Sequence, residues 1–169
     1  MASAIELYLI RHGIAEERGP EWPDDAKRPL TRKGELRMRE EASGLAALGV
    51  TLDLVLTSPL MRARQTAEIV ARGLPGKPRV EVIDSLSPAS AYSAFVKDLA
   101  AHAGPSRVGC VGHEPDLGQL AARLIGAARA VELKKGAICR IDLDGLPPPG
   151  PGVLRWLATP RMLRSAPRG

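Results

Sequence analysis

The chain has 169 residues, of which 44% are hydrophobic, and its formal net charge at neutral pH is +5. This length suits one domain with a single sizeable core, and the hydrophobic content excludes a disordered chain. Charges interrupt the apolar runs well before the roughly 20 residues that a membrane helix needs, and the first residues lack the pattern of a signal peptide. We therefore expect a cytoplasmic protein without a membrane partner.

The positive charge is spread along the chain and forms no basic block. With few aromatic residues available for base stacking, this pattern does not favour a nucleic-acid partner and is compatible with anionic substrates. The two cysteines, Cys110 and Cys139, lie in apolar runs at a spacing that matches no zinc site. We expect them to be buried, reduced thiols.

Strand-like and helical patterns alternate along the chain. The apolar, strand-like segments are residues 5–10, 52–57, 80–83, 107–112, 137–143 and 153–158. The helical segments are residues 31–48, 59–72, 89–103 and 116–125. Thr31 and Asp116 have the character of N-caps, while Gly49 and Gly126 have the character of helix stops.

This alternation predicts an α/β fold, a three-layer α/β/α sandwich around a mostly parallel sheet. The last two strands are joined by a Pro/Gly-rich connector at residues 144–152 instead of a helix, so we expect them to form an antiparallel edge. We assign residues 1–160 to a single domain and residues 161–169 to a loosely packed, basic C-terminal tail.

Polar motifs stand where three of the predicted strands end. They are Arg11-His12-Gly13, Thr57-Ser58-Pro59 and Gly112-His113-Glu114-Pro115. Ligands of open α/β sheets bind beyond the carboxyl ends of the strands, so we expect these three segments to meet at one edge.

Together with Arg62, on the first turn of the helix that follows Ser58, these motifs supply groups suited to a phosphoryl group. The guanidinium groups of Arg11 and Arg62 match phosphate oxygens, and the helix N-terminus after Ser58 adds backbone donors. An imidazole such as that of His12 can accept a phosphoryl group when its tautomer is fixed. Gly13 would free the turn and let a substrate approach the backbone.

Three segments in the same order as in a known family carry a resemblance. They are "RHG" at residues 11–13, "TSPLMRARQTA" at residues 57–67 and "GHEP" at residues 112–115. The chain resembles the histidine phosphatase superfamily over nearly its whole length, and "RPLTRKG" at residues 28–34 and "LKKGAICRIDL" at residues 133–143 resemble its small, SixA-type phosphohistidine phosphatase branch. The resemblance implies a phosphoglycerate mutase-like fold.

The resemblance also implies roles for individual residues. His12 would take the phosphoryl group as a covalent phosphohistidine, and Arg11, Arg62 and His113 would hold its oxygens. No metal or other cofactor would be needed. The residues expected to contact the substrate in addition are Gly13, Ser58 and Gly112.

One position departs from the family pattern. Where small members carry Glu-Leu-x-Pro, this chain reads Asp84-Ser85-Leu86-Ser87-Pro88, so Ser85 replaces the carboxylate that would protonate a leaving oxygen. Asp84 stands one place earlier and is kept as a possible acid, although adjacent strand residues point to opposite faces. A missing acid would impair alkyl phosphates more than a P–N bond, which favours phosphohistidine as the substrate.

The leading hypothesis is a phosphohistidine phosphatase whose partner is a phosphorylated protein. Two alternatives stay open: a general phosphatase of small phosphomonoesters, and a non-catalytic module that binds a phospho-ligand or nucleic acid. The basic residues Arg32, Lys33, Arg64, Lys134 and Lys135 are expected to be solvated surface.

Overall fold

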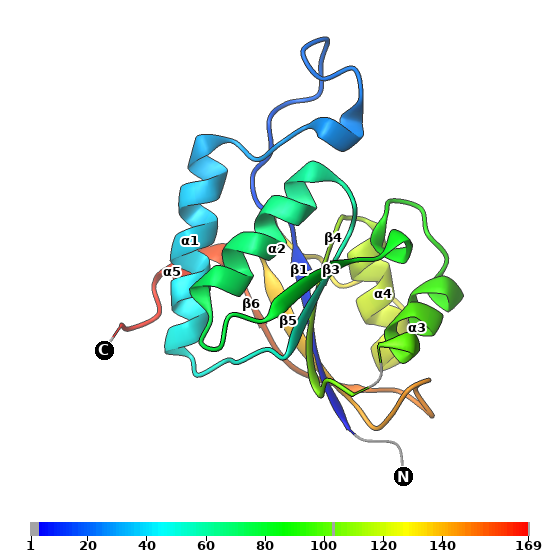
Figure 1. The fold of residues 1–169 in the computed structure, drawn as a ribbon. Coiled ribbons are helices and arrows are strands. Elements are labelled where there is room, and N and C mark those ends of the chain that lie inside the picture. Colours follow the sequence, from blue (N-terminus) through cyan, green and yellow to red (C-terminus); the bar gives the residue numbers. More distant parts are fainter. Residues whose placement is uncertain (1–3, 103, 169) are drawn as a thin grey trace.

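The computed structural model describes residues 4–102 and 104–168. Its centre is one six-stranded sheet with the order β3-β2-β4-β1-β5-β6 (Figure 1). The strands are β1 (Ile5–Arg11), β2 (Leu54–Thr57), β3 (Arg79–Val82), β4 (Arg107–Gly112), β5 (Ile138–Leu143) and β6 (Val153–Ala158). All six lie within two residues of the ranges that the sequence predicts.

The sheet is parallel over four strands and antiparallel at one side. β1 pairs in parallel with β4, and β2 pairs in parallel with both β4 and β3. β5 runs antiparallel to β1, and β6 runs antiparallel to β5. The prediction of a mostly parallel sheet with an antiparallel edge is therefore confirmed.

Helices cover both faces of the sheet, as an α/β/α sandwich requires. α1, α2 and α5 lie on one face, and α3 and α4 lie on the other (Figure 1). Their bounds are α1 (Arg32–Ala47), α2 (Met61–Gly73), α3 (Tyr92–Ala101), α4 (Asp116–Ile125) and α5 (Pro160–Arg164).

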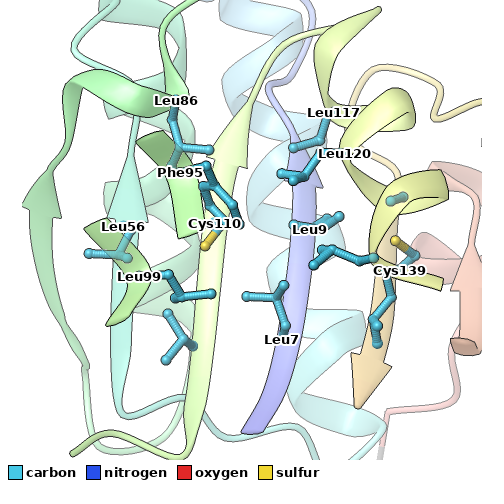
Figure 2. Packing of buried hydrophobic residues seen from close by; sticks show 14 of the residues in the cluster. Leu7, Leu9, Leu56, Leu86, Phe95, Leu99, Cys110, Leu117, Leu120 and Cys139 are labelled. Atoms are coloured by element: carbon cyan, nitrogen blue, oxygen red, sulfur yellow. The ribbon is translucent and has the colours of Figure 1, made fainter. Parts of the chain in front are cut away.

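The period-two alternation of strand residues divides the interior into two cores. Along β1, Leu7 and Leu9 face α3 and α4, whereas Tyr8 and Ile10 face α1, α2 and α5. Figure 2 shows the first core, in which Phe95 and Leu99 of α3 and the α4 residues Leu117 and Leu120 pack with β-strand side chains. Both cysteines are buried and unpaired, in agreement with the expectation.

Helix starts differ from the sequence predictions. α2 begins at Met61 rather than residue 59, and α3 begins at Tyr92 rather than residue 89. Ala89 has a φ angle of 63°, which interrupts a right-handed helix there. Asp116 is the first residue of α4 and not its cap, and its carboxylate accepts the Ala89 N–H at 2.8 Å. The predicted end of the third helix, residue 103, lies outside the described residues.

The segment after β6 is more ordered than the expectation of a loose tail. α5 covers residues 160–164, its Leu163 is fully buried against α1, and Arg164 donates to the Glu41 carboxylate at 2.9 Å. A terminal segment is ordered when such contacts tie it to the rest of the fold, here through the burial of Leu163 and the bond of Arg164 to α1. Among the described residues, no helix has both the length and the apolar character needed to cross a membrane.

Candidate active site

The carboxyl ends of β1, β2 and β4 meet at one edge of the sheet. Arg11 at the end of β1 lies opposite Gly112 at the end of β4. The contact between the two chain segments extends one residue further, since the His12 N–H donates to the Gly112 carbonyl at 3.1 Å. Ser58, one residue beyond β2, donates its N–H to the Val111 carbonyl at 3.1 Å. The three motifs therefore converge as the alternating pattern predicts.

His12 is buried, and its tautomer is fixed by a backbone acceptor. Its Nδ1 lies 2.7 Å from the Gly13 carbonyl oxygen. A carbonyl can only accept, so Nδ1 carries the proton and Nε2 keeps its lone pair. Burial, and after it the positive charges of Arg62 and Arg11 nearby, lowers the pKa of His12 to about 3. The neutral ring thus keeps an unprotonated nitrogen at physiological pH, as nucleophilic catalysis by an imidazole requires.

His113 is the second buried imidazole of the site, and its ring centroid lies 5.1 Å from that of His12. Its Nε2 is 2.8 Å from the Ser58 hydroxyl, which also accepts the Leu60 N–H at 3.2 Å. With its oxygen accepting from Leu60, Ser58 can donate its hydroxyl hydrogen to Nε2, which leaves the ring proton on Nδ1. That Nδ1 is buried and has no protein partner. Burial lowers the pKa of His113 to about 4, so this ring is also neutral.

The two arginines are anchored by one side of their guanidinium groups. Arg11 Nη1 donates to the Leu133 carbonyl at 2.8 Å, while Arg62 donates to the Asp25 carbonyl at 2.9 Å and to the Asp25 carboxylate at 3.0 Å. The Nε atoms of both arginines are buried without a partner. Buried donors that lack a partner are uncommon in folded proteins, and here three of them belong to the residues of this site: Arg11, Arg62 and His113.

Asp25 is a residue that sequence analysis misses. It lies in a short 3-10 helix (Asp25–Lys27) of the loop after the first motif, and it also accepts from Arg28 at 2.9 Å. Hydrogen bonds from Arg28 and Arg62 hold its pKa below the usual value against the opposing effect of burial. The only signal in the sequence is an acidic residue near the "RPLTRKG" segment, which does not identify its arginine partner.

Thr66 is the other residue that sequence analysis misses. Its hydroxyl accepts the Gly13 N–H at 3.1 Å and donates to the Arg62 carbonyl at 2.8 Å. Thr66 lies one helical turn after Arg62 on the buried face of α2, so it links the turn after β1 to the helix that carries the arginine. A threonine at this spacing is common in helices and carries no specific signal.

The structure gives Gly13 a different reason from the one expected. Gly13 does not have a positive φ angle, so backbone freedom is not what requires glycine. A Cβ atom at this position would lie 2.6 Å from Met38 Cγ and 3.4 Å from Leu30. The absence of a side chain therefore lets α1 pack closely under the turn that holds His12.

The structure places Ser85, and not Asp84, towards the site. These two residues belong to a 3-10 helix (Asp84–Leu86) instead of a strand. Ser85 lines a cavity of about 350 Å³ beside Gly112 and His113, and its hydroxyl oxygen is buried without a partner. Asp84 is exposed and is not among the residues that line this cavity.

Comparisons with known proteins agree with the geometry. A family model described as the histidine phosphatase superfamily (branch 1) matches residues 7–87. Phosphohistidine phosphatase SixA of Escherichia coli K12 is 30% identical over 165 residues, which cover 96% of this chain and 98% of SixA. An uncharacterized protein of a Picosynechococcus species is 42% identical over 138 residues, covering 79% of this chain and 82% of that protein.

Solved structures give the same result. The structure of the protein histidine phosphatase SixA complexed with tungstate has a TM-score of 0.82 to this chain at 30% identity, covering 93% of this chain and 98% of that one. The chain belongs to the histidine phosphatase superfamily, and its fold is the phosphoglycerate mutase-like α/β fold. It is a homologue of SixA, and these similarities support activity as a phosphatase.

Proposed function

We propose that the protein hydrolyses phosphohistidine in proteins through a covalent phospho-His12 intermediate. The observation that carries this proposal is the fixed tautomer of His12: its Nδ1–H is bound by the Gly13 carbonyl, and its ring is neutral, with guanidinium groups nearby. In this proposal His12 is the nucleophile, and Arg11, Arg62 and His113 hold the oxygens of the transferred group. The Nε atoms of the arginines and Nδ1 of His113 are the donors that lack protein partners.

In the first step, the lone pair of His12 Nε2 attacks phosphorus, and the P–N bond to the substrate imidazole breaks. The departing nitrogen takes the bonding pair. When the other substrate nitrogen carries a proton, the leaving group is a neutral imidazole, so no protein acid is needed. Positive groups around the three oxygens stabilise the loose transition state of phosphoryl transfer.

In the second step, water attacks the phosphorus of phospho-His12, and the P–Nε2 bond breaks. The bonding pair returns to Nε2, and Nδ1 retains its proton on the Gly13 carbonyl throughout, so the ring again leaves as neutral imidazole. Orthophosphate is released, and the proton lost by water passes to solvent or to the product. Neither step requires a metal ion or a protein carboxylate.

The position of Ser85 supports phosphohistidine over an alkyl phosphate. An alkoxide leaves poorly unless an acid protonates it, and the side chain that faces the cavity at this position is a hydroxyl. The same cavity of about 350 Å³ beside His113 favours a second candidate function, the hydrolysis of a small phosphomonoester, because its volume lies within the range of small-molecule sites. The ratio of kcat/KM for a phosphohistidine peptide to that for an aliphatic phosphomonoester distinguishes the two functions.

The direct test is phosphate release from a phosphohistidine peptide in the presence of a chelator. We expect release by the parent protein and a loss of more than a thousandfold in His12→Ala, since the covalent route then has no acceptor. His102→Ala is the matched control, because it removes a histidine that lies outside the site and contacts Glu81 at 2.9 Å. Full activity in His12→Ala would overturn the mechanism, and release only from the phosphomonoester would favour the second function.

We also propose that the enzyme works in the cytoplasm on phosphorylated proteins. The support for this location is the pair of buried, reduced cysteines, which suits a reducing compartment.

A further inference from the structure

A second cavity, of about 520 Å³, lies beside the turn that holds His12. Arg11 and Gly13 form part of its wall, so it adjoins the proposed phosphoryl site. Most of the remaining wall comes from α1, from the turn before β5 and from α5. We call this space the basic cavity, and its cationic side chains are Arg11, Arg37, Lys134, Lys135, Arg161 and Arg164.

The basic cavity contains far more positive than negative charge. Glu41 is the one acidic side chain among its lining residues. Glu41 is buried and bonded to Arg164, and burial raises its pKa to about 7, so it offsets only part of the positive charge. Over residues 4–102 and 104–168, no ion pair involves Arg37, Lys134, Lys135 or Arg161. By contrast, Arg39 pairs with Glu35 and Arg107 pairs with Asp53 elsewhere on the surface.

The backbone fixes these cations next to the reaction centre. Lys134 and Lys135 directly follow Leu133, whose carbonyl accepts from Arg11 at 2.8 Å. After them, Gly136 donates its N–H to the carbonyls of both Arg11 and His12 at 3.1 Å. The turn is thus fastened at both ends to the residues that are proposed to bind and receive the phosphoryl group. Both lysines are exposed, as the sequence suggests, but they border a cavity and not an open face.

We infer that the basic cavity binds a second anionic group, a carboxylate or a phosphate, of the same ligand whose phosphoryl group is held at Arg11. Lysine and arginine side chains that lack protein carboxylate partners attract such groups, and like charges gathered in a concave space raise the local concentration of anions. This inference rests on the proposed function and names a preference within its substrate class: phosphorylated substrates with further negative charge near the phosphoryl group.

The test compares two phosphohistidine peptides of equal length, one with three glutamates and one with three glutamines beside the phosphorylated residue. Binding is measured by calorimetry in the His12→Ala background, which removes the proposed nucleophile, at 0.15 M salt. We expect about tenfold tighter binding of the glutamate peptide, since each exposed ion pair contributes modestly and several would act together. In the Lys134→Ala/Lys135→Ala variant, we expect the preference to disappear, because the two ammonium groups that would attract the second anion are removed. The backbone contacts of Leu133 and Gly136 are retained, so the turn itself should keep its position.

The matched control is Arg72→Ala/Lys97→Ala, which removes the same charge from exposed positions outside the basic cavity and should retain the preference. A second pair of probes, inorganic tripolyphosphate and orthophosphate, identifies the source of the anion. A lysine-dependent preference for the glutamate peptide alone identifies acidic side chains, and a lysine-dependent preference for tripolyphosphate alone identifies a second phosphate. Either result supports the inference.

No preference for the more negative probe in either pair, or a preference of equal size in the Lys134→Ala/Lys135→Ala variant, would overturn the inference. Hydrolysis is measured separately in the chain that retains His12. A lysine-dependent preference without phosphohistidine hydrolysis would reject the proposed function and keep the anion site. Hydrolysis without any preference would reject the anion site and keep the proposed function.

Discussion

Asp25 controls the orientation of Arg62 without itself belonging to any motif. Arg62 is buried, and a guanidinium that is free to rotate would lose its alignment with a phosphate. Asp25 prevents this by accepting from Arg62 through both its backbone carbonyl and its carboxylate, at 2.9 and 3.0 Å. We therefore regard Asp25 as a positioning residue.

We predict that Asp25→Ala lowers kcat for phosphate release by about ten- to a hundredfold, the usual effect of misplacing a group that binds the transition state. KM should change little, because the poorer alignment of Arg62 weakens substrate binding while the loss of a negative charge that repels the substrate strengthens it. Asp25→Asn should recover much of the lost rate, since its amide oxygen still accepts from Arg62. Steady-state kinetics of the parent and both variants measure the effect. An unchanged kcat in Asp25→Ala would show that the backbone carbonyl alone suffices and that Arg62 does not need the carboxylate.

The pKa of His12 leads to a prediction for the pH dependence of activity. Burial first, and then the nearby positive charges, lower this pKa to about 3, so the nucleophilic neutral form persists as the pH falls from 7.5 to 5. Since kcat/KM reports the free enzyme, its acid limb should contain no ionisation of an ordinary histidine near 6.5. We expect a flat profile over this range once the ionisation of the substrate is accounted for. An enzyme ionisation near 6.5 that lowers kcat/KM would contradict the buried, neutral His12.

At the scale of elements, the docking of α5 depends on a glycine in α1. A Cβ atom on Gly44 would lie within 1.8 Å of the Leu163 carbonyl oxygen, which is a backbone atom and cannot move aside alone. Leu163 itself is fully buried. This close approach brings α5, and with it Arg161 and Arg164, to the wall of the basic cavity.

We predict that Gly44→Ala lowers the free energy of unfolding by about 1–3 kcal/mol, even though alanine is the better helix former by roughly 1 kcal/mol. Ser43→Ala is the matched control, because Ser43 is exposed on the same helix and its replacement should be neutral or slightly stabilising. Chemical denaturation of the three proteins measures the difference. Equal or greater stability of Gly44→Ala would mean that α5 is not held against α1 as the structure describes.

The elements and the motif residues were predictable for different reasons. Period-two and continuous apolar patterns locate all six strands, and the rule for strand ends brings Arg11, Ser58 and His113 together. The predicted helix starts are less accurate. Ala89, for example, adopts a positive φ angle that no local sequence pattern predicts. Asp25 and Thr66 were missed because their importance depends on tertiary contacts, with Arg62 and with Gly13, which local patterns do not encode.

At the scale of the whole molecule, the site is assembled from three distant segments at one edge of the sheet that separates the two cores. The neutral imidazoles of His12 and His113 are buried there, 5.1 Å apart. Burial lowers their pKa values to about 3 and about 4, whereas in the unfolded chain both would titrate near 6.5. Below pH 6.5 the unfolded state therefore binds more protons, and protonation favours unfolding.

We predict that stability falls as the pH is lowered from 6.5 towards 4.5, with His12 contributing on the order of 2 kcal/mol to the loss. Urea denaturation at a series of pH values measures it. The double variant His12→Asn/His113→Asn should show a much smaller decline. His102→Asn, which removes the third histidine, should keep the parent's decline.

The comparison between variant and parent is informative because other groups titrate in the same window. Glu41 has a pKa raised to about 7 by burial, so its effect has the opposite sign: the folded state holds its proton more tightly, and stability rises as the pH falls from 7 towards 4.5. This effect of Glu41 is present in parent and variant alike and cancels in their difference.

Hydrogen bonds from Arg107 keep the pKa of Asp53 below its usual value, so that carboxylate begins to lose its contribution to stability only under more acidic conditions. A double variant that declined as steeply as the parent would therefore place the acid sensitivity outside the histidine pair, and would contradict the burial of two neutral imidazoles at the sheet edge.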